Sequence, residues 1–117
     1  MQFQPDDLVY GPSAMGELRR LQQKAGGKLL NDVPKPINKT FIQHSIDTME
    51  QVLINENNIH FDLSNMNDLE NLLINKGDFA NTVTSQEIRY LQNHWNRFQE
   101  NVRFYVNGRR VDAPWNV

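Results

Sequence analysis

Residues 84–117 read TSQEIRYLQNHWNRFQENVRFYVNGRRVDAPWNV and carry the clearest structural pattern in the chain. Thr84 and Glu87 stand in the S/T-x-x-E spacing, in which a hydroxyl and a carboxylate cap the first turn of a helix reciprocally. The pattern therefore predicts a long helix from residue 84, with Trp95 and Phe98 facing the core. The apolar residues beyond the cap recur at steps of three and four and form one stripe: Ile88, Leu91, Trp95, Phe98, Val102 and Tyr105.

Two interpretations remain open for residues 102–113. In the first, the helix continues to Tyr105, and Asn107-Gly108 supplies the left-handed residue that ends it. In the second, Asn107-Gly108 is the two-residue turn of a β-hairpin, and residues 109–117 are its second strand or a tail. Such a turn would set compatible partners opposite each other: Phe104 and Val111, Tyr105 and Arg110, Arg103 and Asp112. The hairpin is the favoured interpretation.

Three other segments have the periodicity of amphipathic helices, at residues 13–25, 38–55 and 64–76. Glycines that follow the first and the third provide their ends. In the second, apolar residues share one face, and His44 lies on the opposite, solvent side. We expect all three helices to pack on the core through their apolar faces.

Extended structure is predicted for the segments between these helices. Residues 1–12 contain two prolines and are expected to form an apolar arm, and residues 28–37 to form a connection held open by two more prolines. At residues 59–63, apolar residues alternate with His60 and Asp62, which is typical of a strand. This segment is the expected third strand beside the hairpin, because a two-stranded ribbon is only marginally stable.

These patterns together predict one domain over residues 1–117 of a mainly α (α+β) class. It would contain three to four amphipathic helices, including a long C-terminal helix, and a small C-terminal β-hairpin. An all-α bundle is the alternative if residues 102–113 stay helical.

The composition narrows the kinds of protein that the chain can be. It has no cysteine, which excludes disulfides, thiolate zinc sites and a cysteine nucleophile. No apolar run approaches the roughly 18 residues that span a bilayer, and the first residues lack the pattern of a signal peptide. We therefore expect a cytoplasmic protein that does not contact membranes.

Signatures of catalysis and of metal binding are also missing from the sequence. The serines are not in a Gly-x-Ser-x-Gly elbow, and no two histidines have the His-x-x-x-His spacing. Gly26-Gly27-Lys28 follows a predicted helix, whereas a phosphate loop precedes one. We expect neither an enzyme nor a bound cofactor or metal ion.

The favoured function is protein binding. If the last helix ran past Asn101, Tyr90, Arg97 and Phe104 would recur every seven residues on a second face, and Trp115 would lie near the terminus. Aromatic residues and arginine are the types enriched at interface hot spots. We expect a small non-catalytic interaction or assembly protein, such as an adaptor or inhibitor. It would bind a protein partner or a second copy of itself through these four residues.

A nucleic-acid-binding regulator is the alternative, because basic residues gather in the first helix and around the hairpin turn. Against it stand a net charge of −2 and a sequence pI of about 5.9. The residues that would contact phosphates are Arg19, Arg20, Lys24, Arg103, Arg109 and Arg110.

Overall fold

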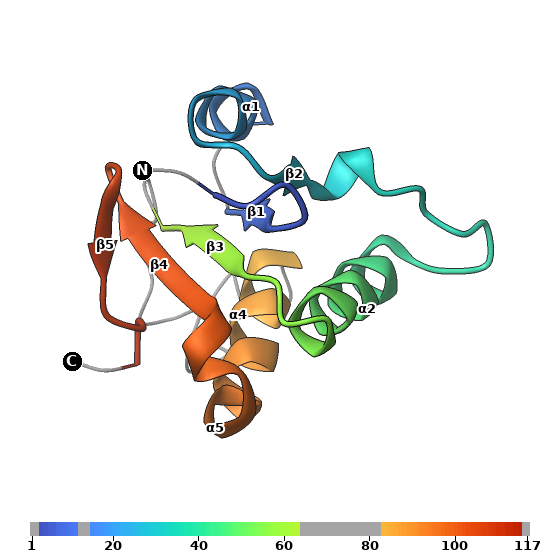
Figure 1. Ribbon diagram of the computed structural model, residues 1–117. Helices are drawn as coiled ribbons and strands as arrows, with labels where there is room; N and C mark the ends of the chain where they lie inside the picture. Colours follow the sequence, from blue (N-terminus) through green and yellow to red (C-terminus); the bar gives the residue numbers. More distant parts are fainter. Residues whose placement is uncertain (1–2, 12–14, 64–82, 116–117) are drawn as a thin grey trace.

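A five-stranded sheet organises the computed structural model, which describes residues 3–11, 15–63 and 83–115 (Figure 1). The strand order is β2-β1-β3-β4-β5, and all neighbours are parallel except β4 and β5. The strands are β1 (Leu8–Tyr10), β2 (Lys28–Leu29), β3 (Ile59–Asp62), β4 (Val102–Val106) and β5 (Arg109–Val111). The helices are α1 (Met15–Ala25), α2 (Phe41–Ile54), α4 (Val83–Asn93) and α5 (Trp95–Phe98).

The predicted mainly α class, and its all-α alternative, are wrong. The structure is an α+β fold in which a mixed sheet, rather than a helix bundle, forms the centre of the described residues. Sequence periodicity missed β1 and β2 because they are only three and two residues long. β1 is also buried on both faces, so it does not alternate between apolar and polar residues. β1 lies in residues 1–12, which were predicted as an extended arm, and β2 lies in residues 28–37, which were predicted as an extended connection.

The hairpin interpretation is confirmed. β4 and β5 pair with Phe104 opposite Val111 and Tyr105 opposite Arg110, around a turn with positive φ at Asn107 and Gly108. The strand predicted after the second helix is also confirmed, since β3 pairs with β4.

The helix predicted from residue 84 is shorter than expected. It begins at Val83, is interrupted at His94, and continues as α5 only to Phe98. A single 3-10 turn, Gln99–Asn101, then leads into β4. Phe98 is buried as predicted. Glu87 is buried against α2, where it accepts a hydrogen bond from Ser45.

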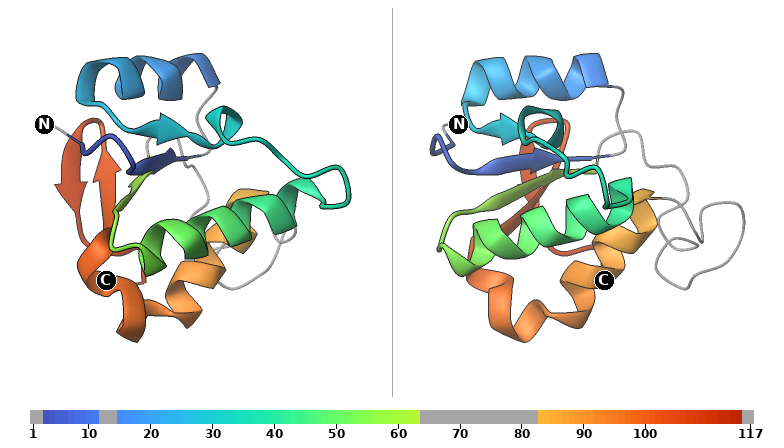
Figure 2. Two further views of the ribbon diagram at one scale, coloured as in Figure 1. Left: turned by 45° about the vertical axis from the view of Figure 1, so that its right-hand side comes forward. Right: turned by 90° about the vertical axis from the view of Figure 1, so that its right-hand side faces the viewer.

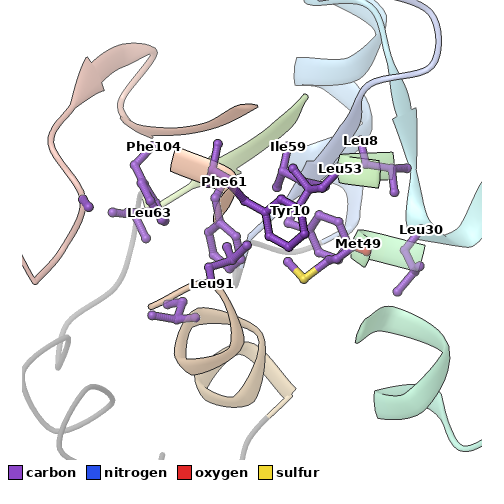
Figure 3. Close-up of a cluster of buried hydrophobic side chains, with 14 residues drawn as sticks. Leu8, Tyr10, Leu30, Met49, Leu53, Ile59, Phe61, Leu63, Leu91 and Phe104 are labelled. Carbon is purple, nitrogen blue, oxygen red and sulfur yellow. The ribbon is translucent and has the colours of Figure 1, made fainter. Parts of the chain in front are cut away.

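Helices cover the two faces of the sheet unequally. α1 lies on one face, and α2 and α4 lie on the other (Figure 2). On the α2 and α4 side, Tyr10, Phe61 and Phe104 stand in register across three strands. Met49 of α2 and Leu91 of α4 belong to the same buried cluster (Figure 3). This is the larger of the two described cores.

The core under α1 is smaller. It contains Phe3, Val9, Leu18, Ala25, Leu29 and Tyr105. α1 contacts β1 and β2 most closely, so its buried residues anchor that half of the sheet. On the β3 and β4 half of this face, the ring of Phe3 stacks on His60 with 3.6 Å between centroids.

Two predictions on the remaining helices have different outcomes. His44 was expected on the solvent side, but it is buried, with Nε2 3.2 Å from the Val33 carbonyl oxygen. The reason is that the residues before α2 pass close to this helix. The helix predicted at residues 64–76 lies outside the described residues. None of the described helices has the length and apolar character needed to cross a bilayer.

Replacing two glycines with alanine should separate backbone strain from a steric clash. Gly108 has φ +80° and open space where a Cβ would lie, so Gly108→Ala should lower the free energy of unfolding by about 1–2 kcal/mol. Gly26 has φ +99°, and a Cβ would lie 2.9 Å from the Phe3 carbonyl oxygen. Gly26→Ala should therefore cost about 3 kcal/mol or more, because overpacking adds to the strain. Urea denaturation measures both values, and equal losses would contradict this account.

Candidate functional site

Three buried polar side chains form a hydrogen-bonded chain on the α1 face of the sheet. His60 of β3 lies between the other two, with Nε2 2.8 Å from Asp7 Oδ2 and Nδ1 2.8 Å from Tyr105 Oη. All three residues are at least 94% buried. A carboxylate can only accept hydrogen bonds, so His60 Nε2 carries the proton and Nδ1 accepts from the Tyr105 hydroxyl.

The ionisation of this chain follows from its surroundings. Burial alone would raise the pKa of Asp7, but hydrogen bonds from His60 and from the backbone amides of Asn58 and Gln4 outweigh it and lower that pKa. Burial lowers the pKa of His60 more than Asp7 raises it. Burial raises the pKa of Tyr105, against the opposing charges of Arg103 and Arg110. At pH 7 the carboxylate is therefore charged, the imidazole is neutral and the phenol is protonated.

A hollow of about 500 Å³ opens next to this chain, and we call it the arginine cleft. Arg103 and Arg110 both line it, on neighbouring strands of the hairpin. The carboxylate of Asp7 stays charged but is buried and held by hydrogen bonds, so the two arginines place positive charge above a floor that carries one buried negative charge. Its full lining is Phe3, Gln4, Asp7, Asn58, His60, Arg103, Tyr105, Gly108 and Arg110.

A second hollow, of about 660 Å³, shares the two arginines, and we call it the hairpin hollow. The ring of Trp95 forms its aromatic wall and meets Trp115 edge to face, with centroids 5.0 Å apart. These are the two tryptophans of the whole sequence. The hairpin hollow is lined by Trp95, Gln99, Val102, Arg103, Phe104, Arg110, Val111, Asp112 and Ala113.

The four residues predicted to bind a partner do not form one surface. Phe104 and Trp115 pack on each other, with ring centroids 5.7 Å apart, and Phe104 is only 1% exposed. Tyr90 lies on α4, where its hydroxyl donates to Glu50 at 3.2 Å. Arg97 lies on α5 with its guanidinium 4.7 Å from the Phe98 ring centroid. The predicted face required a continuous helix, and the chain leaves the helix before Phe104.

The six basic residues of the nucleic-acid alternative lie on two elements. Arg19, Arg20 and Lys24 belong to α1, and Arg103, Arg109 and Arg110 belong to the hairpin. Arg19 is paired with Asp32 through two hydrogen bonds of 2.8 and 2.9 Å, which lower the pKa of Asp32 to about 2. Arg103 and Arg110 line both hollows, whereas Arg109 comes directly before Arg110 in β5 and its side chain therefore projects to the other face of the sheet.

Sequence reasoning missed the polar chain itself. Asp7 lies in the segment predicted to be an apolar arm, and His60 lies in the alternation predicted to be a strand. The alternation around His60 is visible in the sequence, but its hydrogen-bond partners Asp7 and Tyr105 are 53 and 45 positions away from it. The described residues hold no group of three or more His, Cys, Asp or Glu side chains that could bind a metal ion.

No protein-family model matches the chain, and no curated protein or solved structure is significantly similar to it. The function is therefore inferred from geometry and charge.

Proposed function

We propose that the chain is a non-catalytic binding protein that holds an extended acidic segment of a partner protein along strand β5. The observation that carries this proposal is the position of β5 at the edge of the described sheet (Figure 1). Arg110 and Val111 of this strand also line the hairpin hollow. All three residues of β5 are exposed. An exposed edge strand is a template for an added strand from a partner.

The hairpin geometry supports this use of the edge. In a two-residue hairpin, the residues that flank the turn exchange both backbone hydrogen bonds, and the next pair does not. The flanking pair here is Val106 and Arg109, and the next is Tyr105 and Arg110. The backbone amide and carbonyl of Arg110 therefore point away from β4 and towards a partner strand.

Charge indicates the chemistry of the partner. Arg110 and Arg109 project to opposite faces of β5. Arg103, on the neighbouring strand β4, lies on the same face of the sheet as Arg110. Asp112 is the one acidic side chain among the residues that line the hairpin hollow. Acidic side chains of a partner strand would pair with the arginines. An apolar residue between two acidic residues of that strand would point to the other face and contact Trp95.

A partner protein is favoured over nucleic acid for two reasons. The net charge of −2 opposes a polyanion of high charge density, although it does not prevent local pairing with a carboxylate. Arg19, one of the basic residues assigned to nucleic acid, is already paired with Asp32.

Tryptophan fluorescence provides a direct test, because the two tryptophans of the chain lie together beside the hairpin hollow. Titration with tryptophan-free peptides of alternating acidic and apolar residues should give a saturable change in emission. Arg110→Ala should weaken binding about 10-fold or more, and Arg97→Ala, an exposed arginine on α5, should leave it unchanged. Arg110→Pro also removes the outward amide, so it should weaken binding further.

Other outcomes would identify other functions. Equal losses in Arg110→Ala and Arg97→Ala would contradict docking on β5. A duplex oligonucleotide that binds at low salt and dissociates steeply as salt rises would favour the nucleic-acid alternative. An increase in mass with concentration, measured by light scattering and abolished by Arg110→Pro, would identify a second copy of the chain as the partner.

A further inference from the structure

A third hollow lies at the carboxyl ends of β1 and β2. Its volume is about 190 Å³. β1 and β2 are parallel, with α1 above them and α2 and α4 below (Figure 2). In open α/β sheets, ligands bind in the crevice outside the carboxyl ends of parallel strands. The lining residues are Val9, Tyr10, Gly11, Leu18, Leu29, Leu30, Asn31, Phe41, Thr84 and Glu87.

A buried carboxyl group stands in this mostly apolar lining. Glu87 is 4% exposed and accepts a hydrogen bond from the Ser45 hydroxyl of α2. The Tyr10 hydroxyl of β1 in turn donates to the Ser45 carbonyl oxygen at 3.2 Å. The carboxyl group is therefore held in place by residues of two other elements. No lysine or arginine is among the described residues that line the hollow.

We propose that this hollow binds a small primary amine with an apolar body, and that the ammonium group pairs with Glu87. The hollow has the volume of about six water molecules, which fits a single ring or a short branched chain. Its aliphatic and aromatic walls would bury that body, and a few polar groups would orient it. An ammonium ion supplies the positive charge that the described lining of the hollow lacks.

The pH dependence of binding identifies the group involved. Burial raises the pKa of Glu87 to about 7, and Tyr10 of β1 is the other titratable group that interacts with it. Burial and the charge of Glu87 raise the pKa of Tyr10, so it stays neutral over this range. The ammonium group of the ligand forms an ion pair only with the ionised carboxylate of Glu87. Its affinity should therefore fall about 10-fold or more between pH 8 and pH 5.5.

Benzylamine is the probe, and its binding can be followed by calorimetry and by NMR shifts of residues in the hollow. Glu87→Gln keeps the size of the side chain and should weaken binding about 10-fold or more at pH 8. The matched control is Glu100→Gln, an exposed residue after α5, which should bind as the wild type does. Thr84→Leu adds bulk to the lining and should also reduce affinity.

The proposal is overturned if benzylamine does not bind saturably to the folded chain at pH 8. It is overturned as well if benzyl alcohol binds equally well, or if Glu87→Gln retains full affinity, since the hollow would then be only an apolar cavity. Binding that is unaffected by Thr84→Leu would place the amine elsewhere. This site shares no lining residue with the hairpin hollow, so its test and that of β5 are independent.

Discussion

Asp7→Ala is expected to lower the free energy of unfolding by about 3–5 kcal/mol, because Asp7 is the centre of a buried hydrogen-bond network. Its carboxylate accepts from His60 Nε2 at 2.8 Å and from the backbone amides of Asn58 at 2.9 Å and Gln4 at 3.1 Å. Alanine would leave these donors without their acceptor at a position that is only 1% exposed. Urea unfolding, followed by tryptophan fluorescence and circular dichroism, measures the loss.

The neighbouring residue is a matched control. Asp6 is exposed and forms a 3.1 Å ion pair with Lys28 at the surface. Asp6→Ala removes the same chemical group but should change stability by less than about 1 kcal/mol, because water screens exposed pairs. Similar losses in the two variants would show that the polar chain does not contribute to the stability of the fold.

Acid should reduce the difference in the free energy of unfolding between wild type and Asp7→Ala. The folded-state pKa of Asp7 is lowered from 3.8, so its stabilisation is complete above that value and is lost as pH falls through the folded-state pKa. His60, which both proteins contain, lowers the stability of both as the pH falls, and this effect begins at higher pH. Its folded-state pKa lies below 6.5, so protonation of the unfolded chain destabilises the fold as pH falls below that value.

Glu87→Gln is expected to have the opposite effect and to stabilise the protein at high pH. Burial raises the pKa of Glu87 from 4.5 to about 7, so the folded state holds a proton that the unfolded state releases between these values. Stability therefore falls as pH rises from 4.5 to 7, and the full penalty of about 3 kcal/mol remains above pH 7. Glutamine keeps an oxygen for the Ser45 hydroxyl and has no charge to desolvate.

The measured quantity is the stability of Glu87→Gln minus that of wild type at each pH. This difference should grow by about 3 kcal/mol between pH 4.5 and pH 8, while Asp7 and His60 titrate identically in both proteins and cancel. Exposed Glu100→Gln should show no such growth. A difference that is constant with pH would mean that Glu87 is not protonated in the folded state near neutrality.

Local chemistry was sufficient to favour the C-terminal hairpin over a continued helix and to predict its third strand. Asn107-Gly108 specifies a tight turn through positive φ at two adjacent residues, and that turn fixes the register of Phe104 opposite Val111. The alternation at residues 59–62 and the helical spacing before Phe98 are also local patterns, which act within a few residues.

The polar chain and the two binding proposals depend on contacts between distant residues. Asp7 and Glu87 are ordinary acidic residues in the sequence, and each becomes special through its neighbours in space. His60 lies 53 positions from Asp7, and Ser45 lies 42 positions from Glu87. Strand register and helix packing bring these groups together, and burial then sets their pKa values.

The sequence by itself specified the turn and favoured the hairpin and the strand beside it, because these follow from backbone preferences and short spacings. Only the tertiary structure decided that β1 and β2 are strands, since such short segments gain their hydrogen bonds from parallel neighbours far away in the chain. It also decided the chemistry of Asp7, His60 and Glu87, because desolvation and partners, rather than residue type, determine whether a buried group carries charge.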